Sequence, residues 1–388
     1  MVVDKKSSTH PPLPPTTEDE RLSWLRLLRS RRVGPGTFWR LLAEHGSAAA
    51  ALDALPDLAR SSGVRGYDPF PKHLAEQELD RGSAAGARLV IARDPAYPAA
   101  LRDLPDPPPL LWLLGREDLL QRSCIALVGS REGSSLGLRM ARGLAADLGR
   151  AGHVIVSGLA RGIDAAAHDA ALPCGTVAVM PGGVDLAYPN ENKTLHDRIR
   201  AEGLCLSEQP PGLAPLARHF PLRNRLVSGL SRAVVVVEAE AKSGTLITAR
   251  HALDQGRDVL AVPGHPLDPR SAGCNMLLRD GAALVRSARD ILEALGEPTE
   301  IPPKITELAE PPAAFSPPPR PDPPRRPLRE VARLHRMILD RLARSPLEEE
   351  ALLRDLDAPS RQVSPVLTDL ELDGRIERRP GGLIRRTR

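Results

Sequence analysis

Apolar residues recur along the middle of the chain in short, nearly unbroken runs of strand length. The runs are Cys124–Val128, Val154–Val156, Val177–Met180, Leu204–Leu206, Ala233–Val237, Val259–Val262 and Ala283–Val285. Helix-length stretches separate most of them. Strands without polar alternation are buried on both faces, as in a parallel sheet that helices cover on both sides. The pattern predicts an α/β domain over residues 85–297, with right-handed connections.

The segment before these runs predicts short helices over residues 18–84. An apolar face begins at Trp24, breaks at Val33-Gly34-Pro35-Gly36 and resumes at Phe38. Helix, glycine turn and helix are typical of a SAM-like or helix-hairpin-helix bundle, in which turn amides can hold a phosphate. An ordinary helical bundle, whose glycines only turn the chain, is the alternative that we favour.

Proline marks the connecting segments. Residues 88–121 contain Pro107-Pro108-Pro109 and predict an extended arm that ends in one strand, Leu110–Gly115. Residues 298–327 hold 12 prolines in 30 positions, which predicts a semi-extended linker. The polar residues 1–17 predict a disordered tail.

Residues 328–388 predict a small separate unit. Apolar spacing suggests one helix from Leu334 to Leu342, a second over Leu347–Leu356 and a third about Val363 to Leu372, before a hairpin turn at Arg379-Pro380-Gly381-Gly382. Three helices followed by a hairpin predict a winged helix. Its basic end can touch phosphates, bind a protein or serve as a solubilising tail. Carboxylates on the third helix make it a poor reader of duplex DNA.

The net charge by itself says little about the function. The 53 Lys and Arg against 49 Asp and Glu give a net charge of +4 and a pI near 9.0, which permits nucleic-acid binding. Nearly all cations are Arg, which can clamp a phosphate with two donors, although a GC-rich genome also enriches Arg.

Four widely spaced cysteines without a CxxC pair argue against a zinc ribbon. They favour a reducing cytoplasm. The chain lacks an 18-residue apolar run and an apolar leader, so we expect no membrane span and no signal peptide.

The chemistry concentrates in the loops that follow the strands. They contain Gly129-Ser130-Arg131, Ser157-Gly158-Leu159-Ala160-Arg161-Gly162-Ile163-Asp164, Gly182-Gly183-Val184-Asp185 and Lys242-Ser243-Gly244-Thr245. Parallel strands place such loops at one sheet edge, where glycine backbone and helix N-termini favour anions. A tight turn explains any one loop, but four together predict a row of phosphate sites.

No familiar nucleotide fingerprint is present. The glycines at 129, 133 and 137 do not fit GxGxxG, and Lys242-Ser243 lacks the upstream glycine of a P-loop. We therefore expect no ATP hydrolysis.

One segment combines cations with an aromatic ring. Arg218-His219-Phe220-Pro221-Leu222-Arg223-Asn224-Arg225 has the backbone-tracking charges and stacking ring that single-stranded nucleic acid needs. The alternative is that Phe220 belongs to the core and that the arginines form a solvated face.

Catalytic patterns are weaker. Asp164 and His168 share a helix face without a third ligand, so a helix pair or cap explains them better than a metal. Asp185 and Glu238 can pair, but each also suits hydrogen bonding to loop amides. We expect no catalytic residue, metal or cofactor.

Together these motifs resemble the DNA processing protein A (DprA, or Smf) family, over about residues 95–295. The motifs are Val128-Gly129-Ser130-Arg131, Ser157-Gly158-Leu159-Ala160-Arg161-Gly162-Ile163-Asp164, Gly182-Gly183-Val184-Asp185, Tyr188-Pro189-Asn190-Glu191-Asn192, Phe220-Pro221-Leu222-Arg223-Asn224-Arg225 and Ser243-Gly244-Thr245-Leu246-Ile247-Thr248. The resemblance implies an extended Rossmann fold that binds single-stranded DNA, protects it, loads the RecA recombinase in natural transformation and forms a homodimer. SAM-like and winged-helix units flank this domain in longer members.

By position in the motifs, Arg131 would grip a phosphate, and Phe220 would stack on a base. Lys193 would add a cation. Many members carry a Lys before the Phe-Pro motif, and Arg218 would take that role here. The residues assigned to DNA are Gly129, Ser130, Arg131, Ser157, Gly158, Arg161, Gly162, Asp164, Gly182, Gly183, Lys193, Arg218, Phe220, Arg223, Asn224, Arg225, Ser243, Gly244 and Thr245.

Two other functions stay open. Lysine-decarboxylase-like nucleoside-phosphate hydrolases resemble the chain around Ser243-Gly244-Thr245, but they carry glutamates soon afterwards, where this chain has Leu246-Ile247-Thr248-Ala249. The winged helix could instead act as a duplex-binding transcription unit.

Overall fold

The structure is a computed structural model that describes residues 17–299, 328–343, 345–356, 363, 366–367, 370–371, 373–379 and 383–387. The predicted tail and linker lie almost entirely outside these residues. The chain divides into two compact units, Met1–Lys304 and Ile305–Arg388, which are described separately. Within the described ranges, no helix has the length and apolar character that a bilayer span requires.

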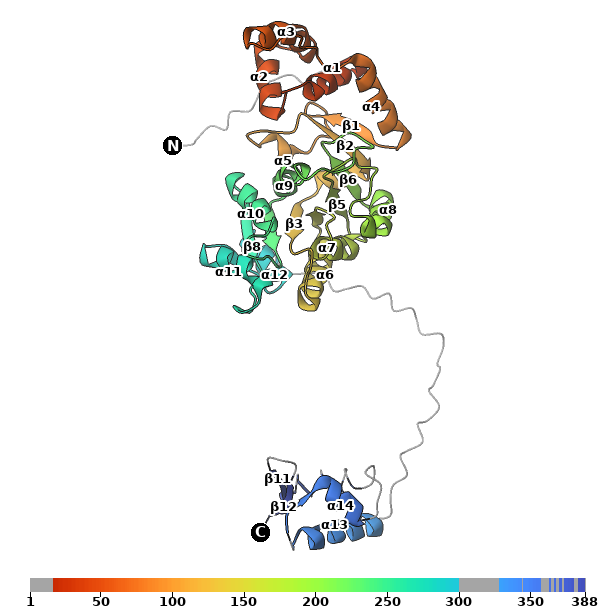
Figure 1. The fold of residues 1–388 in the computed structure, drawn as a ribbon, viewed down its shortest axis with the longest axis vertical. Helices are drawn as coiled ribbons and strands as arrows, with labels where there is room; N and C mark the ends of the chain where they lie inside the picture. The colour runs from red at the N-terminus through yellow and green to blue at the C-terminus, as the bar shows by residue number, and fades with distance from the viewer. Residues whose placement is uncertain are drawn as a thin grey trace. The chain divides into compact units, whose positions relative to one another are not determined.

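Four helices form the N-terminal module of the first unit (Figure 1): α1 (Glu18–Arg29), α2 (Pro35–His45), α3 (Ala48–Ser61) and α4 (Lys72–Ala84). The Thr17 hydroxyl caps α1 by accepting from the Glu20 amide at 3.1 Å. Trp24, Phe38 and Trp39 pack ring against ring, with centroids 4.9 to 5.6 Å apart. The helical prediction for this segment is confirmed.

A nine-stranded sheet follows, in the order β1-β2-β6-β5-β4-β3-β7-β8-β9. Its strands are β1 (Arg88–Ile91), β2 (Leu110–Gly115), β3 (Cys124–Val128), β4 (Val154–Ser157), β5 (Thr176–Val179), β6 (Leu204–Ser207), β7 (Ala233–Val236), β8 (Asp258–Ala261) and β9 (Ala283–Leu284). Strands β3 to β9 pair in parallel, as the apolar runs predict. The strand order reverses between β3 and β7, because the chain leaves β6 on one side of β3 and returns as β7 on the opposite side of β3.

The prediction of an arm with one strand was wrong. The arm begins with a second strand, β1, which pairs antiparallel with β2, and β2 pairs antiparallel with β6. Four residues followed by Ala92-Arg93-Asp94 are too short a run to stand out in the sequence. The sheet is therefore parallel except at this edge.

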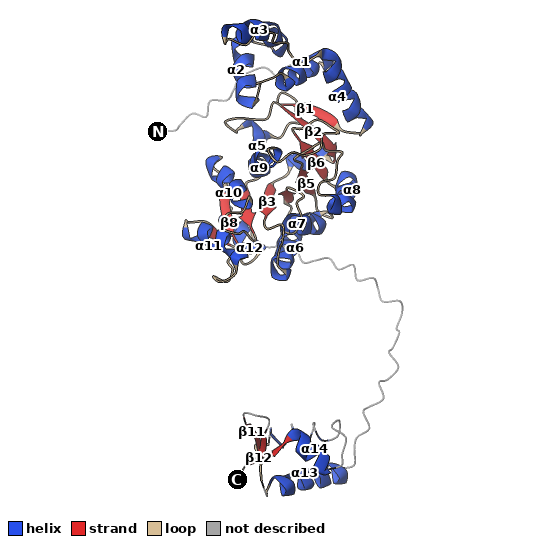
Figure 2. Cartoon of the chain, in the orientation of Figure 1, coloured by secondary structure: helices blue, strands red, loops and turns tan. Residues whose placement is uncertain are grey.

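Helices cover both faces of the sheet (Figure 2). The helices are α5 (Ala99–Arg102), η1 (Glu117–Gln121), α6 (Ser135–Arg150), α7 (Ile163–Ala171), η2 (Asn190–Asn192), α8 (Lys193–Glu202), α9 (His219–Gly229), α10 (Thr245–Asp254), η3 (Pro269–Ser271), α11 (Ala272–Arg279) and α12 (Ala288–Ala294). Helices α6, α7 and α12 share one apolar core with the sheet, and α5, α9, α10 and α11 share another. The N-terminal module packs on β1 and β2 in a third core.

The second unit contains α13 (Leu328–Leu342), β10 (Leu347–Glu348), α14 (Glu349–Leu356), β11 (Ile376–Arg379) and β12 (Leu383–Arg386). Its three strands pair in the order β10-β12-β11. Val363, Val366, Leu367 and Leu370 are helical and buried in its core, in agreement with the predicted winged helix. The predicted second helix was two residues too long, since β10 precedes it. Residues 380–382 of the predicted turn lie outside the described residues.

Candidate nucleic-acid interface

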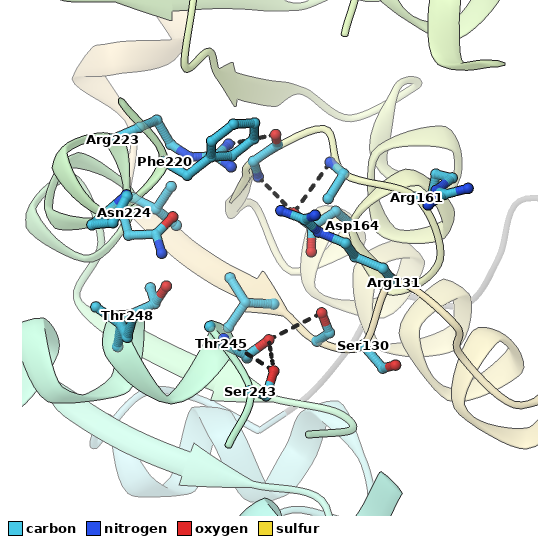
Figure 3. A pocket seen from close by; sticks show the side chains of 18 of the residues that line it. Ser130, Arg131, Arg161, Asp164, Phe220, Arg223, Asn224, Ser243, Thr245 and Thr248 are labelled. Carbon is cyan, nitrogen blue, oxygen red and sulfur yellow. Dashed lines mark hydrogen bonds between the residues drawn. The ribbon is translucent and has the colours of Figure 1, made fainter. Parts of the chain in front are cut away.

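A pocket of about 480 Å³ opens at the carboxyl ends of β3, β4 and β7, where the strand order reverses. Loops after these strands form one wall, and α9 with the start of α10 forms the other (Figure 3). Of the residues assigned to DNA, the pocket brings together Gly129, Ser130, Arg131, Gly158, Arg161, Asp164, Phe220, Arg223, Asn224, Ser243, Gly244 and Thr245. Crevices at such reversal points are where open α/β sheets bind ligands.

Four assigned residues serve the loops behind the pocket. The Ser157 hydroxyl is buried and donates to the Leu127 carbonyl at 2.6 Å. Gly162 has a φ of +74°, and a Cβ there would collide with the main chain of Ser130 and Arg131. Gly182 and Gly183 pack against residues 210–215.

Three assigned cations lie elsewhere. Lys193 and Arg218 are exposed outside the pocket lining, so DNA contact stays a prediction for them. Arg225 is buried and donates to Glu208 at 2.6 Å, on the side of α9 away from the pocket lining. The alternative of a solvated arginine face does not hold for Arg223 and Arg225, both less than a tenth exposed.

Arg223 is the most enclosed cation of the pocket. Its guanidinium donates to the Gly158 carbonyl and, at 2.6 Å, to the Val179 carbonyl. Burial lowers the pKa of Arg223 to about 10; the nearby Asp164 carboxylate opposes this shift and Arg131 adds to it. The side chain therefore remains a fixed positive charge at neutral pH.

Asp164 organises the second loop. Its Oδ2 accepts from the Gly158 amide at 3.1 Å and the Ala160 amide at 3.4 Å. Burial raises the pKa of this carboxyl, and the charge of Arg223 with the two amides opposes that shift. His168 does not pair with Asp164, because its Nδ1 lies 2.7 Å from the Thr176 hydroxyl.

Arg131 and Phe220 form a cation over a ring. The guanidinium carbon of Arg131 lies 5.4 Å from the Phe220 ring centre, and Tyr188 meets the same ring edge-on at 5.6 Å. Tyr188 is 43% exposed. It stands in the Tyr-Pro motif quoted above, yet its place beside Phe220 depends on folding that the motif does not reveal.

Hydroxyl and amide groups line the α10 side. The Thr245 hydroxyl donates to the Gly129 carbonyl at 3.1 Å and lies 3.0 Å from the Ser243 hydroxyl. Thr248 and Asn224 both line the pocket and are labelled on the same side of it in Figure 3. Thr248, Ile247 and Glu240 are lining residues that sequence analysis did not assign.

A carboxylate of the protein itself lies at the N-terminus of α6. The Glu238 carboxylate occupies it, accepting from the Ser134 amide at 2.9 Å and the Ser134 hydroxyl at 2.5 Å. A Cβ on Gly137 would collide with this carboxylate. Asp164 likewise accepts from the amides of Gly158 and Ala160. Protein carboxylates thus engage several of the loop amides, and the predicted row of phosphate sites stays a prediction.

The charges at the pocket are mixed. Arg131, Arg161 and Arg223 face Glu132, Asp164 and Glu240 across the lining, and Asp164 is turned into its own loop. Arg161 and Glu191 form an exposed pair at 3.6 Å. Directed donors, rather than an excess of positive charge, therefore distinguish the site.

Within the described ranges, no three metal-ligating side chains cluster. Asp185 and Glu238 do not pair with each other. Asp185 accepts from the Gly212 amide at 2.8 Å, and Glu238 binds Ser134, so both carboxylates serve loop amides.

The strand order and the pocket define a Rossmann-type α/β protein with a pocket at the reversal point. Residues 88–296 match the family described as DNA recombination-mediator protein A, and the chain belongs to this family. Residues 18–80 match a DprA-like N-terminal HHH domain and residues 317–382 a DprA winged helix domain.

Curated and solved relatives agree with this family. The DNA processing protein DprA of Streptococcus pneumoniae is 48% identical over 205 residues, which are 51% of this chain and 71% of that protein. The pneumococcal structure aligns with a TM-score of 0.58 and 37% identity, over 72% of this chain and 98% of that one. DNA processing protein A from Helicobacter pylori aligns with a TM-score of 0.50 and 32% identity, over 54% and 95% respectively.

Proposed function

We propose that the pocket binds single-stranded DNA. The observation that carries this proposal is the Arg131 guanidinium over the Phe220 ring, beside the buried charge of Arg223. Single-strand sites combine cations for the backbone with a ring on which a base stacks. The Helicobacter pylori relative, whose structure is described by its single-stranded DNA binding mode, supports the assignment.

Each group has a role in this proposal. Arg131 and Arg161 neutralise phosphates, and the Ser130 hydroxyl adds a hydrogen bond. Phe220, buttressed by Tyr188, stacks on a base. Asn224 and Thr248 offer donors and acceptors to base edges, while Asp164 and Arg223 hold the loop in place.

The proposal extends to the wider role of the chain. We infer a DNA-processing role in natural transformation, in which the chain protects incoming single strands, loads RecA and acts as a cytoplasmic homodimer through its α/β domain. The family description as a recombination mediator supports this role.

Binding without catalysis fits the pocket better than nucleoside-phosphate hydrolysis. Asp164 is committed to loop amides, and Glu240 precedes the Gly-Thr pair rather than following it. Release of free base from a nucleoside monophosphate would contradict this choice.

Titration of a fluorescent oligonucleotide tests the proposal. Arg131→Ala loses a phosphate contact and the cation over Phe220, so we expect affinity to fall roughly 10-fold, equivalent to about 1.4 kcal/mol. Phosphates neutralised by Arg131 and Arg161 predict a slope of log K against log salt of about −1.4, which the variant makes shallower by about 0.7.

Arg139→Ala is the matched control, because Arg139 is exposed on α6 outside this pocket. It should bind as the unmodified chain does. Equal affinity in Arg131→Ala and the control would contradict the proposal that this pocket binds single-stranded DNA.

A further inference from the structure

The pocket helix α9 is held from behind by Arg225. This side chain is 8% exposed. Its Nη2 donates to Glu208 Oε1 at 2.6 Å, and its Nη1 donates to the Asp106 carbonyl at 3.0 Å. Arg225 thus ties α9, which carries Phe220 and Arg223 into the pocket, to two segments outside it.

The first of these segments connects to the N-terminal module. Glu208 directly follows β6, and its main-chain carbonyl accepts from Arg29 of α1 at 3.1 Å. Burial raises the pKa of the Glu208 carboxyl, while the charges of Arg225 and Arg29 oppose that shift. Arg29 also binds Glu78 of α4 through Nε at 3.0 Å and Nη2 at 2.8 Å. Glu208 therefore lies between the module and the pocket helix.

The second segment connects the same two parts. In residues 92–109, the Pro107 carbonyl accepts from Trp39 of the module at 2.7 Å. Leu101 and Leu104 pack on the end of α9, where a Cβ on Gly229 would approach them to 3.0 and 2.8 Å. The arm is thus fixed by the module on one side and supports α9 on the other.

We infer that Glu208 is a positioning residue for the DNA pocket, through which docking of the N-terminal module fixes α9 and sets the affinity of the site. The inference rests on the proposed function. A buried guanidinium that loses its partner is an uncompensated charge that destabilises its position, and a movement of α9 carries Phe220 and Arg223 with it. Coupling of this kind is reciprocal, so DNA in the pocket must also stabilise the module.

Two substitutions in the full chain test the coupling. Glu208→Gln keeps the size of the side chain and removes the charge that holds Arg225. Arg29→Met removes the hydrogen bond from the module to Glu208, leaves the contact of Trp39 with Pro107, and keeps the pair of Glu208 with Arg225 intact. We expect each to weaken binding of a thymine homopolymer by about 5-fold or more, as measured by fluorescence anisotropy.

Matched controls make the same two kinds of substitution at exposed positions. Glu202→Gln is exposed at the end of α8, and Arg60→Met is exposed on α3. Both should stay within about twofold of the unmodified chain. Circular dichroism melts check that the variants fold. If Glu208→Gln does not fold, the affinity of Arg29→Met tests the inference.

Amide hydrogen exchange separates positioning from a merely structural role. The oligonucleotide should slow exchange in α1 and α4 of the unmodified chain, and this slowing should be smaller in Arg29→Met. Unchanged affinity in folded variants, or no slowing in the unmodified chain that binds DNA, overturns the inference. Failure of the unmodified chain to bind at all would instead overturn the proposed function.

Discussion

The buried charged side chains near the site have hydrogen-bond partners within the protein. Arg223 gives its donors to main-chain carbonyls, and Asp164 accepts from main-chain amides. His168 shares the Thr176 hydroxyl, which itself donates to the Ile155 carbonyl at 2.8 Å. The histidine must therefore be the donor at Nδ1, and it is buried as a neutral ring. Arg223 therefore stays charged and His168 neutral at neutral pH.

Acid should destabilise the fold through His168. Burial first and the charge of Arg223 second lower the pKa of His168 to about 3, while an unfolded histidine titrates near about 6.5. The unfolded state thus binds the extra proton between these values. The free energy of unfolding should fall as pH falls through this window, by up to about 1.4 kcal/mol per pH unit.

His168→Gln cannot take up this proton, so its stability should decline less on acidification. Urea unfolding at several pH values between about 7 and 4 measures the difference. His73→Gln, exposed on α4, is the control and should keep the slope of the unmodified chain. An unaltered slope in His168→Gln would show that other groups control acid sensitivity.

Among individual residues, the sequence predicted those that line the pocket better than those that pack behind it. Loop glycines, Arg131 and Phe220 could be located because strand ends and motif spacing place them together. Arg225 could not be separated from Arg223, because its orientation toward Glu208 depends on the path of the chain after β6. Lining by Ile247 and Thr248 follows from the pitch of α10 against α9, which spacing alone does not fix.

Among the elements, helix α4 packs very closely on strand β2. Gly82 lies so near the Trp112 ring that a Cβ would collide with it. Trp112 is 1% exposed, and its indole donates to Glu78 at 3.1 Å. The ring cannot move aside without breaking that bond, so the contact determines how the N-terminal module docks.

Gly82→Ala should therefore destabilise the module by roughly 1–3 kcal/mol through overpacking. Tryptophan fluorescence during urea unfolding reports it, since Trp24, Trp39 and Trp112 all lie in the module or beneath it. Gly143→Ala in α6 meets open space and should be neutral or stabilise by up to about 1 kcal/mol. Equal effects of the two substitutions would contradict the packing argument.

Element types followed from the apolar pattern where burial is complete. All seven parallel strands fall within one residue of the predicted runs. Six of them are largely buried on both faces, whereas the edge strand β9 is exposed. Strands β1 and β10 were missed, since four- and two-residue strands owe their conformation to partners distant in sequence.

Taken as a whole, the molecule has two units, each with a core of its own. Every residue that lines the pocket lies in the first unit. The second unit is a winged helix whose hairpin carries Arg375 and Arg386 as exposed cations. Single-strand affinity and any duplex affinity should thus reside in different parts of the chain.

Ending the chain at Lys304 tests this division. The shortened protein should keep single-strand affinity within about twofold of the full chain, because it retains the whole pocket. Duplex binding measured in parallel shows what the winged helix contributes. A large loss of single-strand affinity would assign part of the site to the second unit.

The carboxylate of Glu238 at the start of α6 affects which nucleotides can bind at this helix. In dinucleotide-binding members of this fold class, the diphosphate rests on the corresponding helix. Here the Glu238 carboxylate lies at that position, so a diphosphate placed there would meet a negative charge. Abundant metabolites such as ATP and NAD therefore have no anchor there, which leaves the neighbouring arginines available to a polymer.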